Sequence, residues 1–387
     1  MSTLPPLPEF LAEIRRWIEV NIDTLAPFYR AAPETYEDRI AVGSRFLRVL
    51  YDAGWMRYGW PEAIGGFGGD ARYRTAFYDT LWDTGYPPPE QHMTLEVIGS
   101  PLLHYNAPLA AELMPKYLSG EASLSQGFSE PEAGSDLAAL RCRAVRDGDG
   151  PDADFVVNGQ KIWTSNGYLS EQCILLVRTG TTESRHRGLS MLMVDMDTPG
   201  ITRRPIAYAN HHNELAEVFY DDVRVPSNRL LGEVNDGWGV AMYLLQFERG
   251  LYPWLRASRM LYRLELLREQ LRERGLTDAW RAQELGHAFL AISALRARAA
   301  RTVRRLSVGE TIGPDSSGDK IMLANGEQLM LETARRVLGG QLQLEDSASA
   351  RDWRSEWQFT RSASIYGGSA EVQRSIVADR VLRLPKD

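Results

Sequence analysis

The spacing of apolar residues changes twice along the 387-residue chain, and this change limits the folds that it can adopt. In residues 8–120, and again after residue 232, apolar side chains recur every three or four positions, which is typical of helices. Between them, short β-rich runs alternate with turn residues, as in a compact antiparallel barrel or sandwich. The pattern predicts an α+β, mainly α fold in three domains: an N-terminal helical domain (1–121), a central β domain (122–232) and a C-terminal four-helix bundle (233–387).

Local sequence signals refine this prediction. Asn325-Gly326 is typical of a hairpin turn, but its flanks have helical spacing, so we expect a helix there. The glycine cluster at residues 65–69 has no strand before it and no Lys-Ser/Thr after it, so we expect a loop rather than a phosphate-binding site. Strands are expected at residues 155–157, 162–164, 174–177, 189–196, 201–206 and 218–225.

Composition excludes several classes of function. The net charge of -7 argues against nonspecific binding to nucleic acid, which requires a basic face. The two cysteines provide neither a disulfide framework nor a metal cluster, which fits a reducing compartment. No apolar run reaches the length of about 18 residues that spans a membrane, and the first residues show no signal peptide. We therefore expect a cytoplasmic protein that binds neither membrane nor metal.

Two stretches in the β region are suited to binding a large planar ligand. Residues 126–136 (QGFSEPEAGSD) form a turn-rich segment whose small residues let backbone N–H groups approach a ring or a pyrophosphate. Residues 158–167 (NGQKIWTSNG) read as a strand that leaves a tight turn, in which Trp163 offers a flat apolar wall with donors beside it. Either stretch alone is also what a polar-edged hairpin in an ordinary β domain would show.

Together, in this order and about 25 to 30 residues apart, the two stretches resemble the flavin cradle of the acyl-CoA dehydrogenase family. A third stretch, residues 362–382 (SASIYGGSAEVQRSIVADRVL), resembles the segment that lies over the flavin in that family, and the resemblance extends over essentially the whole chain. Ser369 is placed to cap a helix with Glu371 in its first turn. The resemblance implies FAD as cofactor, held by Gln126, Phe128, Ser129, Gly134, Ser135, Trp163, Ser165, Ser369 and Glu371.

The family's reaction requires a base and a polarised thioester. Dehydrogenation removes a proton from the α carbon and passes a hydride from the β carbon to flavin N5, while donors at the thioester oxygen stabilise the developing charge. Many members carry the base as a glutamate directly after the tyrosine that matches Tyr366, but this chain has Gly367 there. Its backbone N–H can still donate to the thioester oxygen, because that interaction needs no side chain.

A minority branch of the family carries the base on the first long helix of the C-terminal domain, directly before an arginine. Glu248 and Arg249 match that position, in an apolar setting that suits a proton-accepting carboxylate. The resemblance therefore implies Glu248 as the catalytic base and assigns Ser135, Phe247, Arg249 and Tyr366 to substrate binding. The alternative is a solvated helix glutamate paired with a neighbouring base. Gly250 and Pro253 weaken this helix, and together with Gly367 they predict room for a branched, ring-bearing or long acyl group.

The resemblance also implies partners. The substrate is an acyl-CoA or a carrier-bound thioester, and the electrons pass to an electron-transfer flavoprotein. We expect a homodimer or a tetramer of such dimers, with a mixed oligomer left open. Arg281, Gly339 and Gly340 match a half-site that completes the flavin pocket of a neighbouring subunit.

Two other functions remain open at this level. A flavin monooxygenase or N-hydroxylase of the same fold needs no carboxylate base, which suits Gly367 but leaves Glu248 without a role. A non-catalytic subunit that binds acyl thioester in a mixed oligomer is the second alternative.

Overall fold

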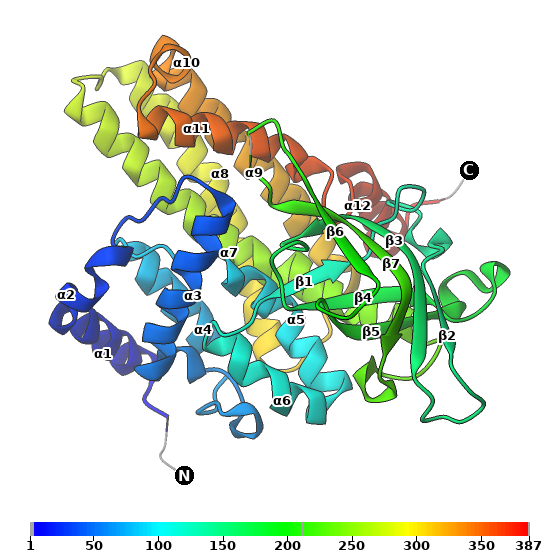
Figure 1. Cartoon of the computed structure of the whole chain (residues 1–387). Coiled ribbons are helices and arrows are strands. Elements are labelled where there is room, and N and C mark those ends of the chain that lie inside the picture. The colour runs from blue at the N-terminus through cyan, green and yellow to red at the C-terminus, as the bar shows by residue number, and fades with distance from the viewer. Residues whose placement is uncertain (1–3, 211, 386–387) are drawn as a thin grey trace. The chain divides into compact units, whose positions relative to one another are not determined.

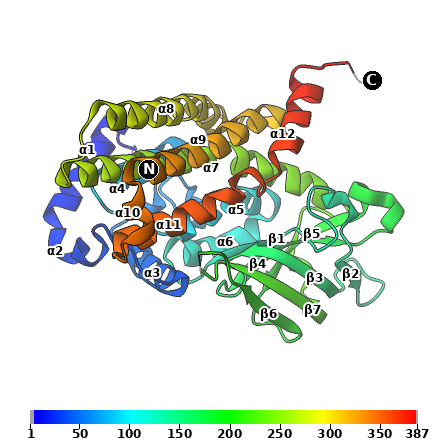
Figure 2. The same cartoon turned by 90° about the horizontal axis from the view of Figure 1, so that it is seen from above.

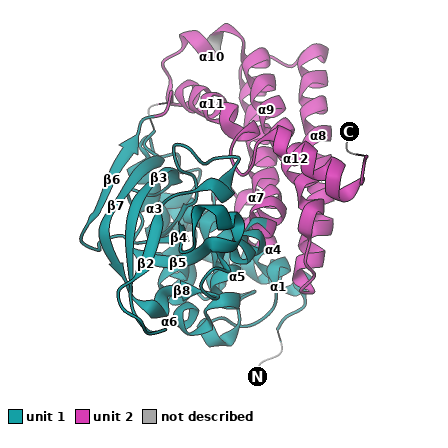
Figure 3. Ribbon diagram, turned by 90° about the vertical axis from the view of Figure 1, so that its right-hand side faces the viewer, with its two compact units in different colours: residues 1–74, 87–207, 212–245 teal, residues 75–86, 208–211, 246–387 magenta. Residues whose placement is uncertain are grey.

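The computed structural model describes residues 4–210 and 212–385 and contains helices, then a β region, then helices again (Figure 1). This order confirms the predicted α+β, mainly α fold. The chain forms two compact units (Figure 3). Unit 1 comprises residues 1–74, 87–207 and 212–245, and unit 2 comprises residues 75–86, 208–211 and 246–387. The boundaries of the three domains expected from the sequence remain a prediction.

The helices that precede the β region begin at side-chain caps where the sequence provides them. The hydroxyl of Thr35 accepts a hydrogen bond from the backbone N–H of Asp38, and Asn106 does the same for Leu109. These caps satisfy N–H groups that would otherwise lack partners at a helix start. The helices are α1 (Leu7–Val20), α2 (Ile22–Leu25), α3 (Tyr36–Asp52), α4 (Ala71–Asp83), α5 (Gln91–Tyr105) and α6 (Ala107–Leu118).

The β region forms one eight-stranded sheet with the order β6-β7-β3-β2-β4-β5-β8, in which β1 pairs with β4. Most neighbours are antiparallel, but β1 and β2 both run parallel to β4. Apolar residues of β3, β4, β5 and β7 pack into a core with fully buried members such as Phe155, Val194 and Val218. The strands are β1 (Leu124–Gly127), β2 (Arg143–Arg146), β3 (Phe155–Ser165), β4 (Gln172–Arg178), β5 (Leu189–Asp195), β6 (Ile201–Ile206), β7 (Leu215–Val225) and β8 (Leu230–Leu231).

All six predicted strand regions lie in or largely within observed strands, with the first two merged into β3. The sequence analysis missed β1, β2 and β8. Each of these has four residues or fewer, which is too short for an alternating pattern to be recognised. The missed strand β1 matters most here, because it leads directly into the first predicted ligand-binding stretch.

Unit 2 contains the long C-terminal helices. Helix α8 runs beside α9 in the views of Figure 1 and Figure 2. Their apolar faces form a core with α7 and α11, in which Leu267, Ile292 and Leu323 are fully buried. Asn325-Gly326 lies inside α9, as predicted. The helices are α7 (Gly237–Glu273), whose first residues belong to unit 1, α8 (Ala279–Ser307), α9 (Ser316–Leu338), α10 (Gly340–Leu344), α11 (Ala348–Phe359) and α12 (Ala370–Ile376). Within the described residues, no helix is both long and apolar enough to cross a membrane.

Candidate functional site

In unit 1, the two predicted ligand-binding stretches lie side by side. The backbone N–H of Ile162 donates to the carbonyl of Ser129 at 2.9 Å, and the ammonium of Lys161 donates to the carbonyl of Phe128 at 3.1 Å. These two bonds attach β3 to the turn that follows β1. The structure therefore brings together stretches that the sequence predicted only from their order.

A buried ion pair that the sequence analysis missed fixes this junction. Lys161 is fully buried, and its ammonium lies 2.7 Å from the carboxylate of Glu130. The same carboxylate accepts hydrogen bonds from the backbone N–H groups of Arg141 at 2.6 Å and Cys142 at 2.8 Å. A buried pair with its remaining hydrogen-bonding capacity satisfied in this way holds a single arrangement of the backbone. Glu130 and Lys161 are therefore positioning residues of the two stretches.

Trp163 has the exposed position that a flat wall for a ring requires. It lies where the pairing of β3 with β7 shifts register between Lys161 and Thr164, and its backbone has a φ of +60°. Such a left-handed conformation is uncommon for a large side chain and is held by the surrounding sheet. The bulge leaves the indole 55% exposed.

The other predicted cofactor contacts of unit 1 surround open space or polar groups. A Cβ added at Gly134 would meet nothing within 4 Å, so the turn leaves room beside its backbone. Ser135 is exposed, and Gln126 and Ser165 are half-buried. An exposed indole with an open glycine turn and hydroxyl groups fits a planar, acceptor-rich ring such as a flavin.

In unit 2, Ser369 caps α12 as predicted: its hydroxyl accepts a hydrogen bond from the backbone N–H of Val372 at 3.3 Å. Glu371 lies in the first turn of that helix with its carboxylate exposed to solvent. The contact of either residue with the flavin stays a prediction.

Arg281, Gly339 and Gly340 are brought together. Arg281 lies in the first turn of α8, which Asp278 caps, and its guanidinium donates to the carbonyl of Val337 at 3.0 Å. Gly339, two residues after Val337, has a φ of +59° and caps the C-terminal end of α9. Gly340 then begins α10. The predicted half-site for a neighbouring subunit is therefore one local structure, although its role stays a prediction.

Glu248 on α7 faces Gly367. A Cβ added at Gly367 would lie 2.7 Å from Oε1 of Glu248 and 3.1 Å from Cε of Lys320. Gly367 itself has a φ of +63°, which favours glycine. The Glu248 carboxylate thus lies against the backbone position from which the glutamate of the commoner family pattern would project. A side chain at residue 367 would therefore require the end of the Glu248 side chain to move.

A second buried ion pair contacts the turn at Gly367 through Tyr366. The guanidinium of Arg256 on α7 is paired with the carboxylate of Glu327 on α9, and the hydroxyl of Tyr366 donates to the same carboxylate at 3.0 Å. Burial, followed by the charge of Glu327, raises the pKa of Tyr366 well above its usual value, so its hydroxyl remains a donor. Tyr366 is therefore anchored through its hydroxyl, and its assignment to substrate binding stays a prediction.

Two further predicted substrate residues lie on α7 beside Glu248. Phe247 is buried, whereas Arg249 is half-buried and its Nε has no hydrogen-bond partner among the described residues. Burial lowers the pKa of the Arg249 guanidinium, and the charge of Glu248 opposes this effect. A terminal nitrogen of Arg249 lies 3.5 Å from the Cβ position of Gly368, next to Gly367.

The sequence predicted space beside the base at Gly250, Pro253 and Gly367. A Cβ at Gly250 would lie 2.6 Å from Cγ2 of Thr302, so this glycine allows α7 and α8 to approach closely. Pro253 lies within one uninterrupted helix from Gly237 to Glu273. At Gly367, the Cβ position lies beside the end of the Glu248 side chain. Gly250 therefore serves helix packing, and the prediction of room for a branched, ring-bearing or long acyl group stays a prediction.

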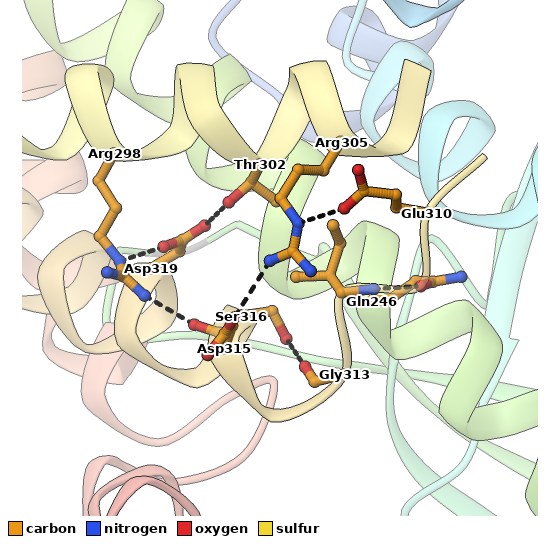
Figure 4. A network of polar contacts seen from close by, with 10 residues as sticks. Gln246, Arg298, Thr302, Arg305, Glu310, Gly313, Asp315, Ser316 and Asp319 are labelled. Carbon is orange, nitrogen blue, oxygen red and sulfur yellow. Dashed lines mark hydrogen bonds and ion pairs between the residues drawn. The ribbon is translucent and has the colours of Figure 1, made fainter. Parts of the chain in front are cut away.

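A polar network holds the start of α9 and the loop before it (Figure 4). Arg298 on α8 is paired with Asp319, which also accepts a hydrogen bond from the hydroxyl of Thr302 at 2.6 Å. At the other end of the network, the side-chain oxygen of Gln246 on α7 accepts a bond from the backbone N–H of Ile312 at 3.2 Å. The network fixes α9 directly before Lys320 and fixes α7 two residues before Glu248.

A β region with a wall for a planar ring and a carboxylate held against a glycine turn are features of a flavin-dependent dehydrogenase. Comparison with known proteins agrees: the acyl-CoA dehydrogenase middle domain matches residues 125–223, and the acyl-CoA dehydrogenase C-terminal domain matches residues 235–382. Acyl-CoA dehydrogenase IpdE1 of Mycobacterium tuberculosis is 36% identical over 98% of each chain. The chain therefore belongs to the acyl-CoA dehydrogenase family, whose members are FAD-binding flavoproteins.

Two solved structures are similar over their whole length. The Tcur3481-Tcur3483 steroid acyl-CoA dehydrogenase has a TM-score of 0.81 and 26% identity, covering 100% of both chains. The ChsE4-ChsE5 complex from Mycobacterium tuberculosis has a TM-score of 0.78 and 26% identity, again covering 100% of both chains.

Proposed function

We propose that this acyl-CoA dehydrogenase oxidises the α,β bond of a bulky, ring-bearing acyl-CoA, and that Glu248 removes the α proton. The observation that carries the proposal is the position of Glu248 Oε1, 2.7 Å from the Cβ position of Gly367. In the commoner family pattern, a glutamate at residue 367 supplies the base. The Glu248 carboxylate projects from α7 toward the Cβ position of residue 367, so it can remove the α proton from a different backbone position.

The residues around Glu248 have separate parts in this reaction. Gly367 leaves its backbone N–H available to donate to the thioester oxygen, which stabilises the enolate that forms when the proton leaves. The Arg256–Glu327 pair and the Tyr366 hydroxyl keep the turn at Gly367 in place. When bound, FAD supplies the acceptor for the hydride that leaves the β carbon. In unit 1, we assign the exposed Trp163 and the open turn at Gly134 to that cofactor.

The proposed substrate class depends on the relatives, because Gly250 packs against Thr302 and the Cβ position of Gly367 lies beside Glu248. One similar structure is named a steroid acyl-CoA dehydrogenase, and two relatives are named cyclohexane-1-carbonyl-CoA dehydrogenases. The relative from Geobacter metallireducens among these is 26% identical over 87% of this chain. Ring-bearing acyl groups are common to these names, and we assign that class to this chain.

We further infer that the chain works in a two-fold assembly and passes its electrons to an electron-transfer flavoprotein. Arg281 and the Gly339-Gly340 pair form one local structure at the ends of α8 and α9, as a half-site for a neighbour requires. The similar ChsE4-ChsE5 structure is a complex of two different chains. The neighbour is thus either a second copy of this chain or a related chain.

Anaerobic titration of the FAD-loaded protein with a panel of acyl-CoAs tests this function. The panel contains butyryl-CoA, palmitoyl-CoA, cyclohexane-1-carbonyl-CoA and a steroid-ring acyl-CoA, and bleaching of the flavin absorbance is recorded. We expect the ring-bearing members to bleach the flavin fastest. Preference for butyryl-CoA would refute the substrate class. Absence of bleaching by every member, together with rapid oxygen consumption on reduction by NAD(P)H, would support the monooxygenase alternative instead.

A further inference from the structure

Gln373 is a fully buried side chain that contacts the turn at Gly367 and has no role in the reaction described so far. It lies on α12, the helix that Ser369 caps. Its side-chain nitrogen donates to the carbonyl of Gly367 at 3.1 Å and to the carbonyl of Gly368 at 3.4 Å. The first of these carbonyls belongs to the residue whose backbone N–H we assign to the thioester oxygen. The amide of Gln373 therefore holds the residue that carries this donor.

Gly368 provides the space that this amide occupies. A Cβ at Gly368 would require the side-chain nitrogen of Gln373 to move away. The φ of Gly368, +92°, also favours glycine. The two consecutive glycines of the turn thus face two different polar side chains: Gly367 faces Glu248, and Gly368 faces Gln373.

The buried amide is only half satisfied, which indicates that its donor is the part in use. The side-chain oxygen of Gln373 is buried and has no hydrogen-bond partner among the described residues. A buried acceptor without a partner is costly. An apolar side chain of similar length would avoid that cost, but it would leave the two glycine carbonyls without this donor. Donation to the turn is therefore what the fold gains from glutamine at this position.

The backbone of Gly367 is held from both sides. On its C-terminal side, the peptide unit is planar, so the bond from Gln373 to the Gly367 carbonyl fixes the orientation of that whole unit. On its N-terminal side, the Tyr366 hydroxyl is bonded to Glu327. The buried ammonium of Lys320 on α9 donates to the carbonyl of Ala363 at 2.6 Å, in the same segment. These bonds leave the N–H of Gly367 little freedom to turn.

We propose that Gln373 is a positioning residue that aims the backbone N–H of Gly367 at the thioester oxygen. The inference rests on the proposed function, in which this N–H stabilises the enolate. Gln373 acts through the turn rather than on the substrate. A donor that is aimed before the reaction stabilises the developing charge most, because no reorganisation is needed when the charge appears.

The experiment compares Gln373→Met, which keeps the length of the side chain and removes its donor, with Gln328→Met as a matched control. Gln328 on α9 also donates through its side-chain nitrogen to a backbone carbonyl, that of Thr360 at 3.2 Å. Among the described residues, it bonds neither glycine of the turn. Gln373→Glu keeps the shape of the side chain and replaces the donating nitrogen with oxygen, so it tests the inference if Gln373→Met does not fold. Glu248→Gln is measured in parallel.

Two readouts are recorded on the FAD-loaded proteins, with any partner chain. The first is the single-turnover bleaching rate at saturation with the panel member that bleaches the wild type fastest, measured anaerobically together with the FAD content and the free energy of unfolding in urea. The second uses benzoyl-CoA labelled with ¹³C at its thioester carbonyl. This ring-bearing thioester has no hydrogen on its α carbon, so it binds without being oxidised. The infrared stretching frequency of its carbonyl falls when a donor bonds to the oxygen.

We expect both Gln373 variants to retain FAD and to bleach about tenfold to 100-fold more slowly, the cost of misplacing a reacting group by about 1 Å. The dissociation constant for benzoyl-CoA should change less than the rate, because the donor bond is strongest when the charge develops. The carbonyl frequency of bound benzoyl-CoA should rise above its wild-type value. Gln328→Met should keep the wild-type rate and carbonyl frequency even where it lowers the free energy of unfolding.

A wild-type bleaching rate in a folded Gln373 variant would overturn the inference. A slower rate with an unchanged carbonyl frequency would do so too, because it would indicate a structural role that does not reach the thioester oxygen. Equal changes in Gln328→Met would indicate general loosening of the fold and would also overturn it. Undiminished bleaching in Glu248→Gln would instead refute the proposed function itself. Collapse in Glu248→Gln with wild-type rates in both Gln373 variants would refute the role of Gln373 alone.

Discussion

The substitution Gly367→Ala tests the relation between the glycine turn and the base most sharply. The new methyl group would lie 2.7 Å from Oε1 of Glu248, so the carboxylate must retreat by about 0.7 Å to reach an ordinary contact of 3.4 Å. A displacement of about 1 Å at a reacting group costs up to about 100-fold in rate. We therefore expect proton removal to slow by about tenfold to 100-fold.

The same substitution also strains the backbone, because alanine at a φ of +63° costs about 1 to 2 kcal/mol. Gly275→Ala is the matched control: it has a φ of +68°, and a Cβ there would meet nothing within 4 Å. Both variants should lose about the same free energy of unfolding in urea, but only Gly367→Ala should slow flavin bleaching by acyl-CoA. Equal bleaching rates in the two variants would refute the contact between residue 367 and Glu248.

Three further experiments test the surroundings of the base. The double variant Glu248→Ala, Gly367→Glu moves the carboxylate to residue 367. It should recover part of the bleaching rate that Glu248→Ala loses, because the truncation clears the space beside residue 367. A double variant that bleaches no faster than Glu248→Ala would contradict this expectation. Glu327→Leu should lower the free energy of unfolding in urea by about 3 to 5 kcal/mol, since it leaves Arg256 buried without its carboxylate, and a loss below about 1 kcal/mol would argue against the pair. Burial lowers the pKa of Lys320 to about 8 in the folded protein, so above that pH the unfolded chain binds more protons than the folded one. This group should therefore raise the free energy of unfolding as the pH rises from about 8 to 10.5. Lys320→Met should lack that gain.

The sequence predicted the fold and the candidate base in different ways. Periodicity predicted the order of helices and strands because each long element repeats its apolar pattern several times. Glu248 is the expected base only through the family resemblance: the commoner position holds glycine, and Glu248-Arg249 matches the motif of the minority branch. The structure adds two features that favour glycine at residue 367: its φ of +63° and the short distance from its Cβ position to Oε1 of Glu248.

The buried cations could not be predicted in this way. Lys161 lies in a strand with alternating polarity and Lys320 in an amphipathic helix, so each reads as an ordinary surface lysine. Their carboxylate and carbonyl partners are 31 and 43 residues away in the chain, beyond any local pattern. Gly250 was misread for the same reason, because its contact, Thr302, lies on another helix.

The most direct test of the central claim is α-proton removal by Glu248→Gln. This variant keeps the shape of the side chain and removes its ability to take a proton. The measurement is exchange of the α proton with deuterated solvent, followed with flavin bleaching under anaerobic conditions in the FAD-loaded protein. We expect FAD to stay bound while both rates fall by about 10²- to 10⁴-fold, the range for loss of a positioned base. Exchange and bleaching at wild-type rates would contradict the assignment of Glu248 as the base.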